Sequence, residues 1–274
     1  MSKDGGKNGS RRQALAWLAA SAAGAATATV ARAKGEVAPT TAPPAPSRCF
    51  AMAIDLDRCL RCRTCVVACA AENNVLPVGW KLSASMRAIH WMDVLVPTDE
   101  RFDLGAWPAP IPCMHCERPE CERVCPVGAT YRNDDGIVVQ IWERCVGCRY
   151  CMVACPYSRR YYNWTEPEWP DEDAGSANPD VAIRHKGMVE KCTFCQHRVR
   201  ALLERARVSG EPVTDEELVH LPACAAACPA EAITFGDLLD PSSTIAELSK
   251  SPRVIRLLVE LATGPKVFYL GSKR

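Results

Sequence analysis

The chain lacks the short motifs that mark the common enzyme sites. It has no P-loop, no GxGxxG, no HExxH and no GxSxG, which argues against nucleotide-binding, zinc-protease and serine-hydrolase sites of the usual kinds. The CxxCH haem signature is absent as well, because Glu117 follows Cys116 and Gln196 follows Cys195. Beyond residue 33 no apolar run reaches the ~20 residues of a membrane-spanning helix, so we expect a soluble chain unless a partner holds it on a membrane.

A strong excess of basic residues is also missing. The 274 residues carry a formal net charge of +1. The first 33 residues hold five Lys or Arg and one Asp, so the remainder has a formal net charge of −3. A protein of that sign is not expected to bind nucleic acid through its overall field.

Cysteine, in contrast, is abundant, with 17 residues. The run from Cys145 to Pro156 has the spacing of a [4Fe–4S] site of bacterial ferredoxin type. The first three thiolates of such a run lie on one tight turn, and the fourth opens the following helix and ligates the other cluster in two-cluster ferredoxins. Four quartets of this kind occur: 59, 62, 65, 69; 113, 116, 121, 125; 145, 148, 151, 155; and 192, 195, 224, 228.

Sixteen cysteines in four quartets match four [4Fe–4S] clusters, and only Cys49 is left over. A disulfide framework is the first alternative, but CxxCxxC turns are too crowded to pair with one another. Zinc ribbons are the second alternative, but a third cysteine three residues on, followed by CxxxCP, is not a zinc pattern. We therefore predict iron–sulfur clusters.

Residues 1–33 are predicted to be a targeting segment. Arg11 and Arg12 belong to a sequence that resembles the twin-arginine export signal, although Ala14 stands where Phe is common. An Ala-rich run and the A-x-A sequence at 31–33 follow, so we expect cleavage before Lys34; the run is marginal for a membrane anchor. The twin-arginine route carries folded proteins, which suits a chain that receives its clusters in the cytoplasm.

The rest of the chain contains an internal repeat. After a Pro/Ala linker at 34–48, the segment that ends at Cys69 aligns without a gap on the segment that ends at Cys155. The second and fourth quartets share a CxxC that leads to CxxxCP and a short β-prone run. The repeat therefore indicates two copies of a two-cluster ferredoxin with α and β elements.

The expected elements follow from local pattern. They are a strand at 50–56, short strands near 129–131 and 232–235, helices at 196–207 and 215–219, a capped segment at 244–247, a helix at 252–262 and an edge strand at 267–270. Two insertions, 71–112 and 157–191, separate the quartets. The aromatic segment 161–169 suits a partner interface and packing on its own core equally well.

Basic residues flank the cysteines, and some of them could raise cluster potentials. We expect most of them to be solvated loop charges. His115 and His197 are expected to be solvent-facing loop residues, with proton-coupled electron transfer to a quinone as the alternative. The basic set is Arg58, Arg61, Arg63, Arg144, Arg149, Lys191 and Arg198.

The twin-arginine start, the four quartets in this order and the sequence Glu190–Cys195 resemble one family. It is the four-cluster electron-transfer subunit of the dimethyl sulfoxide, tetrathionate and polysulfide reductase type, whose exported relatives include the nitrite-reductase-associated subunit and DsrO. The resemblance covers residues 49 to about 240. It implies an α+β, ferredoxin-like fold with two pseudo-symmetric bis-[4Fe–4S] modules, an outer one from 49–70 and 190–240 and an inner one at about 109–160, followed by a helical extension at 241–274.

The family shares its ligands in a nested order, whereas the spacing alone would equally allow neighbouring quartets to pair. Cys69 lacks the usual following proline, and all sixteen ligands are cysteines, so no three-iron site is indicated. The resemblance implies four ligand sets: Cys59, Cys62, Cys65 with Cys228; Cys69 with Cys192, Cys195, Cys224; Cys113, Cys116, Cys121 with Cys155; and Cys125 with Cys145, Cys148, Cys151.

The function implied by the resemblance is that of a periplasmic electron-transfer subunit with no substrate site of its own. Its expected partners are an integral membrane quinone-binding subunit and a further cytochrome, iron–sulfur or molybdopterin subunit. The insertion around 178–180 favours a DsrO-like complex of sulfur metabolism. The alternatives are a subunit of a molybdopterin reductase and a free polyferredoxin, and the sequence leaves the terminal substrate and the direction of electron flow open.

Overall fold

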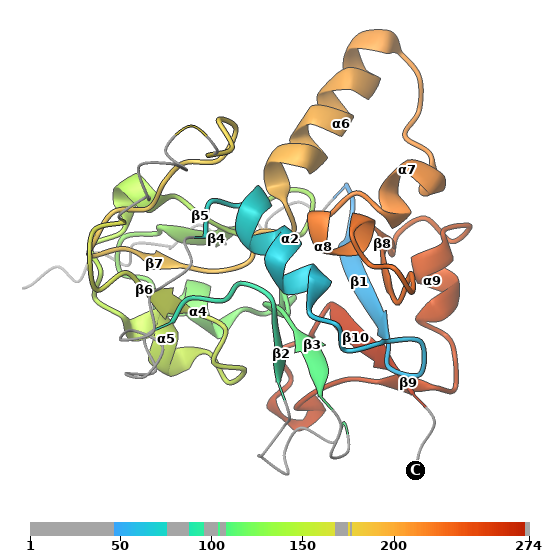
Figure 1. Ribbon diagram of the computed structural model, residues 1–274, viewed down its shortest axis with the longest axis horizontal. Coiled ribbons are helices and arrows are strands. Elements are labelled where there is room, and N and C mark those ends of the chain that lie inside the picture. Colours follow the sequence, from blue (N-terminus) through green and yellow to red (C-terminus); the bar gives the residue numbers. More distant parts are fainter. Residues whose placement is uncertain are drawn as a thin grey trace, which may run out of the picture. The chain divides into compact units, whose positions relative to one another are not determined.

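The computed structural model describes residues 47–75, 88–95, 104, 108–167, 175 and 177–271. All of them belong to one structural unit, residues 45–274, and form a mixed α and β structure (Figure 1). The predicted targeting segment, most of the linker and part of both insertions lie outside the described residues.

The main sheet is built on β1 (Phe50–Asp55). Its strand order is β8 (Ile233–Asp237), β1, β10 (Val267–Leu270) and β9 (Val254–Ile255). β1 runs parallel to β10 and antiparallel to β8, with Met52 opposite Val267 and Phe235. The strands expected near 50–56 and 232–235 are thereby confirmed.

Both faces of β1 are buried, which explains why its sequence is apolar at successive positions. Phe50, Met52 and Ile54 face the interior that contains the cysteines. The alternate residues Ala51 and Ala53 face the opposite way, toward α9 (Thr244–Leu248), because side chains alternate along a strand. The sheet therefore forms one wall of the cysteine-lined interior.

Three two-stranded sheets complete the β structure. They are β2 (Asp93–Leu95) with β3 (Ala109–Ile111), β4 (Thr130–Arg132) with β5 (Val138–Gln140), and β6 (Tyr161–Tyr162) with β7 (Val189–Glu190). The β4–β5 pair repeats the β8–β1 pair, since in each a strand after a CxxxCP segment pairs antiparallel with a strand before a four-cysteine run.

Most of the helices that carry cysteines are short. They are α2 (Thr64–Glu72), α4 (Glu120–Arg123), α5 (Tyr150–Ala154) and α8 (Ala223–Ala226). Two 3₁₀ turns without cysteines are η1 (Trp142–Arg144) and η3 (Val259–Leu261). Cys69 lies inside α2 and Cys155 follows α5 directly. The fourth cysteine of each run thus stands late in its helix or after it, and the expectation that it opens the helix is wrong.

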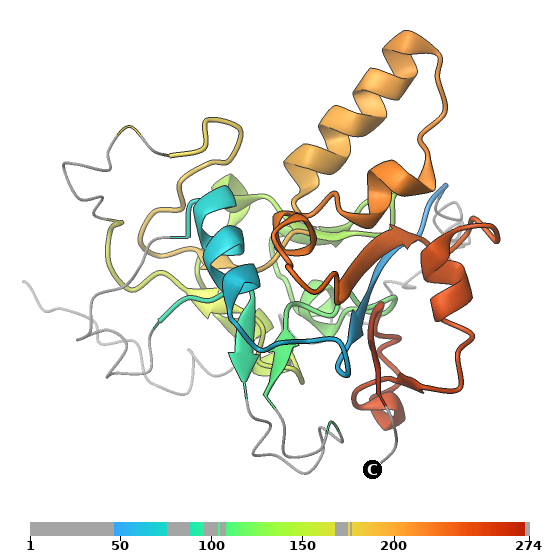
Figure 2. The same ribbon diagram turned by 45° about the vertical axis from the view of Figure 1, so that its right-hand side comes forward.

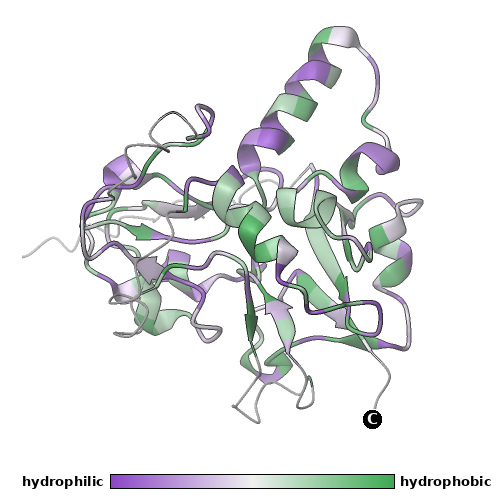
Figure 3. Cartoon of the chain, viewed as in Figure 1, coloured by the Kyte–Doolittle hydropathy of each residue, from purple (hydrophilic) through white to green (hydrophobic). Residues whose placement is uncertain are grey.

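Helix α6 (Gln196–Ser209) extends away from the sheet in both views (Figures 1 and 2). Val199 and Leu202 of its predicted apolar face are buried, and hydrophilic and hydrophobic residues alternate along the helix (Figure 3). Gly210 ends it in the left-handed conformation with φ 76°. Helix α7 (Asp215–Val219) lies where a helix was expected and begins at a capping box formed by Thr214 and Glu217.

The C-terminal segment differs from its prediction. The helix expected at 252–262 is wrong, because these residues form β9 and η3. The strand expected at 267–270 is β10, but it lies between β1 and β9 and is buried, so its description as an edge strand is wrong. The extension adds β9 and β10 to the sheet and also contains the short helix α9.

A buried ion pair of the second insertion makes hydrogen bonds to residues of the first. Arg184 contacts Glu190 at 2.8 Å and lies over the rings of Trp91 and Trp142. Trp91 donates its indole hydrogen to Glu190 at 2.9 Å. Arg184 also donates to the carbonyl of Asn73, which ties this group to the end of α2. None of the described helices has the length and apolar character needed to cross a bilayer.

Candidate iron–sulfur sites

The sixteen cysteines lie in four groups of four, each drawn from two distant segments. Cys59, Cys62, Cys65 and Cys228 line one pocket, and Cys125, Cys145, Cys148 and Cys151 line another. Cys69 is surrounded by Cys192, Cys195 and Cys224, and Cys116 by Cys113, Cys121 and Cys155, close enough to influence one another's ionisation. The arrangement is nested along the chain, and all 17 cysteines are free of disulfide bonds.

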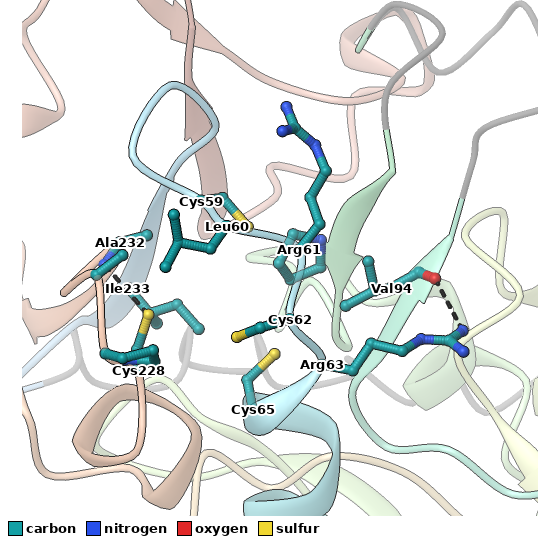
Figure 4. A pocket seen from close by; sticks show the side chains of 13 residues that line it. Cys59, Leu60, Arg61, Cys62, Arg63, Cys65, Val94, Cys228, Ala232 and Ile233 are labelled. Carbon is teal, nitrogen blue, oxygen red and sulfur yellow. Dashed lines mark hydrogen bonds between the residues drawn. The ribbon is translucent and has the colours of Figure 1, made fainter.

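Figure 4 shows the first of these pockets. The sulfurs of Cys62, Cys65 and Cys228 point toward a common space, and Cys59 comes from the loop above it. Ala232 donates its backbone N–H to the sulfur of Cys228 at 3.3 Å. The polypeptide thus brings the C-terminal CxxxCP segment beside the first cysteine run, because β1 and β8 are neighbours in the sheet.

Left-handed backbone residues shape the cysteine turns. Arg61 and Arg63 have φ of 59° and 64°, and Gly147 and Arg149, at the same positions of the third quartet, have 66° and 62°. A left-handed conformation is unfavourable for a residue with a side chain, so its recurrence indicates a turn that the site requires. Gly147 must also lack a side chain, since a Cβ atom there would lie 2.1 Å from the carbonyl oxygen of Gly187.

Two of the four cysteine groups reach the surface, namely the one that contains Cys59 and Cys228 and the one that contains Cys125 and Cys145. Cys62 and Cys148 are exposed. The hydroxyl of Thr64, 3.2 Å from the sulfur of Cys62, lowers the pKa of that thiol. Exposed apolar side chains stand beside both thiols, namely Leu60 and Val67 near Cys62 in sequence and Val146, Tyr150 and Val153 near Cys148.

The two central groups are buried. Burial raises the pKa of Cys116 and Cys192 to about 12 and that of Cys69 and Cys224 well above the ordinary value. Thiolates in such surroundings need a nearby positive charge or a metal ion, and metal binding releases their protons. Without metal these thiols would stay protonated, and iron that binds there must displace their protons.

Hydrogen-bond donors reach the sulfurs of both central groups. Asn73 directs its side-chain amide to Cys195 at 3.6 Å, and Arg160 directs its guanidinium to Cys121 at 3.0 Å. Hydrogen bonds to sulfur are one of the factors that set cluster potentials.

The junction between the two central groups contains two residues that no sequence pattern marks as buried. His115 and Lys191 are both 0% exposed. His115 stacks on Phe194 with ring centroids 3.6 Å apart, and its Nδ1 accepts the backbone N–H of Val138 at 3.2 Å. Lys191 donates to the carbonyls of Val138 and Cys192. The expectations of a solvent-facing His115 and a solvated Lys191 are therefore wrong.

Two further flanking residues form an ion-pair group. Glu72, near the end of α2, accepts hydrogen bonds from His197 at 2.6 Å and from Arg198 at 2.6 Å. Burial alone would raise the pKa of Glu72, but these two partners hold it below its ordinary value. His197 is not a free loop histidine, and no pattern in the sequence links residues this far apart.

The thiols of each group suit a cluster by their type and number. Thiolates are the soft ligands that iron–sulfur clusters select, and a [4Fe–4S] cluster takes four of them. The four groups therefore fit [4Fe–4S] clusters by number and ligand type.

The chain is similar to known iron–sulfur proteins both in a family pattern and in its sequence as a whole. A family model described as a 4Fe–4S dicluster domain matches residues 107–171. The iron–sulfur cluster-binding subunit of menaquinone reductase from Nitratidesulfovibrio vulgaris is 43% identical over 230 residues, which cover 82% of this chain and 89% of that protein.

Two more relatives match most of the chain. Iron–sulfur subunit 1 of the Hdr-like menaquinol oxidoreductase of Archaeoglobus fulgidus is 34% identical over 95% of this chain and 97% of its own length. The tetrathionate reductase of Salmonella typhimurium has a subunit that is 34% identical over 96% of this chain and 88% of its own length. The similarity therefore extends well beyond the segment that the family model matches.

Proposed function

The chain belongs to the family of iron–sulfur subunits of menaquinone, dimethyl sulfoxide, tetrathionate and polysulfide reductases, and on this premise we propose that it carries electrons through four [4Fe–4S] clusters in a membrane-bound, quinone-interacting complex. The observation that carries the proposal is the gathering of sixteen cysteines into four groups of four. Each cluster, when bound, accepts one electron and passes it on.

We assign the ligands by these groups. The four ligand sets are Cys59, Cys62, Cys65 and Cys228 for the first cluster; Cys69, Cys192, Cys195 and Cys224 for the second; Cys113, Cys116, Cys121 and Cys155 for the third; and Cys125, Cys145, Cys148 and Cys151 for the fourth. The pairing of β1 with β8 and of β4 with β5 supports a division into an outer module from 49–70 and 190–240 and an inner module at about 109–160.

The chain's own residues fix the order of the clusters and shield the central two from water. Electrons would enter and leave at the exposed ends, where Cys62 and Cys148 stand beside exposed apolar side chains that suit contact with another protein. We propose an integral membrane quinone-binding subunit at one end and a further redox subunit at the other.

The nature of the further redox subunit distinguishes two versions of the proposal. Similarity to the menaquinone reductase and menaquinol oxidoreductase subunits favours a DsrO-like complex that exchanges electrons with a quinone and serves sulfur metabolism. Similarity to the tetrathionate reductase subunit supports the alternative, a subunit of a molybdopterin reductase. Purification of the native complex decides between them, since only the second contains molybdenum, whereas a free polyferredoxin would copurify with no membrane protein.

Metal analysis tests the cluster count. Anaerobically prepared protein should contain about sixteen irons and sixteen sulfides per chain, four of each per cluster. A Cys49→Ser variant should keep this content, because Cys49 lies outside the four groups, whereas Cys228→Ser should lose or alter one cluster. About four zinc ions per chain and no sulfide would refute the proposal.

We also propose export to the periplasm through the twin-arginine route, on the strength of Arg11 and Arg12. Replacement of both by lysine should leave the protein in the cytoplasm with its clusters intact. The measurement is iron and antibody signal in periplasmic and cytoplasmic fractions. Unchanged periplasmic accumulation in cells that lack the partner subunits would contradict the proposal.

A further inference from the structure

Arg160 is a buried arginine whose guanidinium donates to a cysteine of the third group and also lies near Cys151 of the fourth. Its side chain is among the least exposed of the charged ones, with the residue 4% exposed. One nitrogen, Nη1, donates to Thr130 at 3.0 Å and to Gln140 at 2.7 Å, and the other, Nη2, donates to the sulfur of Cys121 at 3.0 Å. Among the ion pairs of the described residues, none joins Arg160 to a carboxylate.

A buried positive charge is unfavourable unless a negative charge compensates it. The group that Arg160 reaches is a cysteine sulfur, which becomes anionic when it binds iron. A guanidinium is always protonated, so its charge does not depend on the state of the site. Arg160 is therefore placed as a counter-charge to whatever charge the third group carries.

The second group has a different donor, which stands at a different offset in the repeat. Asn73, four residues after Cys69, directs its side-chain amide to Cys195 at 3.6 Å, whereas Arg160 follows Cys155 by five residues. The amide is neutral and its contact to sulfur is longer. Hydrogen bonds from a charged donor are roughly twice as strong as neutral ones, so the repeat supplies unequal donors to the two central groups.

On the basis of the proposed function, we propose that Arg160 is a positioning residue for electron transfer that raises the reduction potential of the cluster held by Cys113, Cys116, Cys121 and Cys155. Reduction adds one electron, and the fixed guanidinium favours the more negative state. At a distance of about 10 Å and an effective dielectric constant of about 20, one unit charge changes such an equilibrium by roughly tenfold. Lys191 is a second buried basic residue at the junction of the central groups. It is present in the wild type and in every variant below, so its effect on the potentials does not contribute to the differences between them.

The test is a redox titration of the fully loaded protein, reduced with dithionite in the presence of mediators and followed by electron paramagnetic resonance. Arg160→Gln should lower the reduction equilibrium constant of one cluster at least tenfold, which is a downward shift of about 59 mV for a one-electron couple. The midpoint potential of the cluster held by Cys125, Cys145, Cys148 and Cys151 should fall by a smaller amount, because Arg160 also lies near Cys151, and the other two should stay where they are. Arg160→Lys, which retains the charge, should restore most of the difference.

Arg159→Gln is the matched control. Arg159 is the neighbouring residue, and its Nε donates to the carbonyls of Tyr157 and Ser158 instead of a sulfur. The potential of the third cluster should shift by much less than in Arg160→Gln, because the partly exposed charge of Arg159 is screened by solvent. Four unchanged potentials in Arg160→Gln, or four that shift together, would overturn the inference, since the first means no influence and the second a general loosening of the structure.

A measurement on the wild type covers the case in which Arg160→Gln fails to load. Protein labelled with ¹⁵N-arginine should show hyperfine coupling between a reduced cluster and arginine nitrogen in pulsed electron paramagnetic resonance, and absence of coupling at every cluster would overturn the inference. Iron content distinguishes a failure of the inference about Arg160 from a failure of the proposed function. Sixteen irons without a potential shift would remove the role of Arg160 alone, whereas a zinc-loaded protein would remove the proposed function itself.

Discussion

At the scale of single residues, Gly147 and Arg61 occupy the same position of the repeat and have nearly the same φ, 66° and 59°. Only Gly147 is obliged to be glycine, because the carbonyl of Gly187 occupies the place of its Cβ atom. The left-handed turn alone therefore does not determine the residue type. The neighbouring chain does.

Gly147→Ala should consequently damage the fourth site. We expect a loss of about 3 kcal/mol in unfolding free energy, from the clash with Gly187 together with the left-handed backbone, and a loss of about four irons per chain. The measurements are chemical denaturation and metal analysis of the anaerobic protein.

Gly128→Ala is the control for this prediction. Gly128 also has a positive φ, 59°, but nothing lies within 4 Å of the place of its Cβ atom. It should cost about 1 kcal/mol, the backbone contribution alone, and leave the iron content unchanged. Equal losses in the two variants would show that the contact with Gly187 is unimportant.

The residue scale also shows what the sequence could reveal of the site. Thiol spacing identified all sixteen cysteines that the structure gathers into groups. The burial of His115, Arg160 and Lys191 could not be predicted, because it depends on segments that pack together from distant parts of the chain. Local spacing reports which residues can bind metal, but not which charges surround them.

At the scale of elements, the interaction of α2 with α6 depends on Glu72. This carboxylate receives hydrogen bonds from His197 and Arg198, which stand in the first turn of α6. It joins a helix that carries Cys69 to a helix that directly follows Cys195. The ion pair therefore connects two segments that supply the second group of cysteines.

Glu72→Gln should reduce the unfolding free energy by about 1 kcal/mol at pH 7, a value already lowered for screening by solvent. Because the folded state lowers the pKa of Glu72, its contribution is complete above the unfolded pKa of about 4.3 and disappears as the pH falls through the folded value. The difference between the variant and the wild type should shrink as the pH falls below about 4.3.

Glu204→Gln provides the comparison, since Glu204 pairs with Arg207 on the exposed side of α6. Denaturation of this variant should match that of the wild type at every pH. If it destabilises the protein as much as Glu72→Gln does, the position of Glu72 between the helices has no special importance.

Elements with strong local signals were predictable, and those decided by tertiary contacts were not. Helix α6, with its apolar face, and helix α7 both lie where the local pattern places them. The sequence at 252–262 has helical spacing, but its first part pairs with β10 and its later part turns through the left-handed residues Leu258 and Ala262. Pairing with a buried strand overrides the weaker local preference.

At the scale of the whole molecule, the four groups join segments that are far apart in the sequence. Cys59 and Cys228 share one pocket although the chain between them contains the other three sites. Metal bound in the groups would therefore cross-link the distant segments within each module.

Removal of iron should accordingly unfold much of the protein. Treatment with a strong chelator and a reductant should abolish the cooperative thermal transition and most of the far-ultraviolet circular dichroism of the described elements. Without iron, the buried thiols of Cys69 and Cys224 would be protonated and no metal would join the segments that carry them. A metal-free protein with an unchanged transition would show that the fold is independent of its clusters.

The nested arrangement has a consequence for biosynthesis. A ribosome that makes this chain from its first residue delivers every ligand of the inner two groups by Cys155, whereas the groups of Cys59 and Cys69 wait for Cys228 and Cys224. A nascent chain that stops early would thus present half-complete sites to the assembly machinery. The site of the earliest cysteine run is therefore complete only after the whole cluster-binding region has been translated.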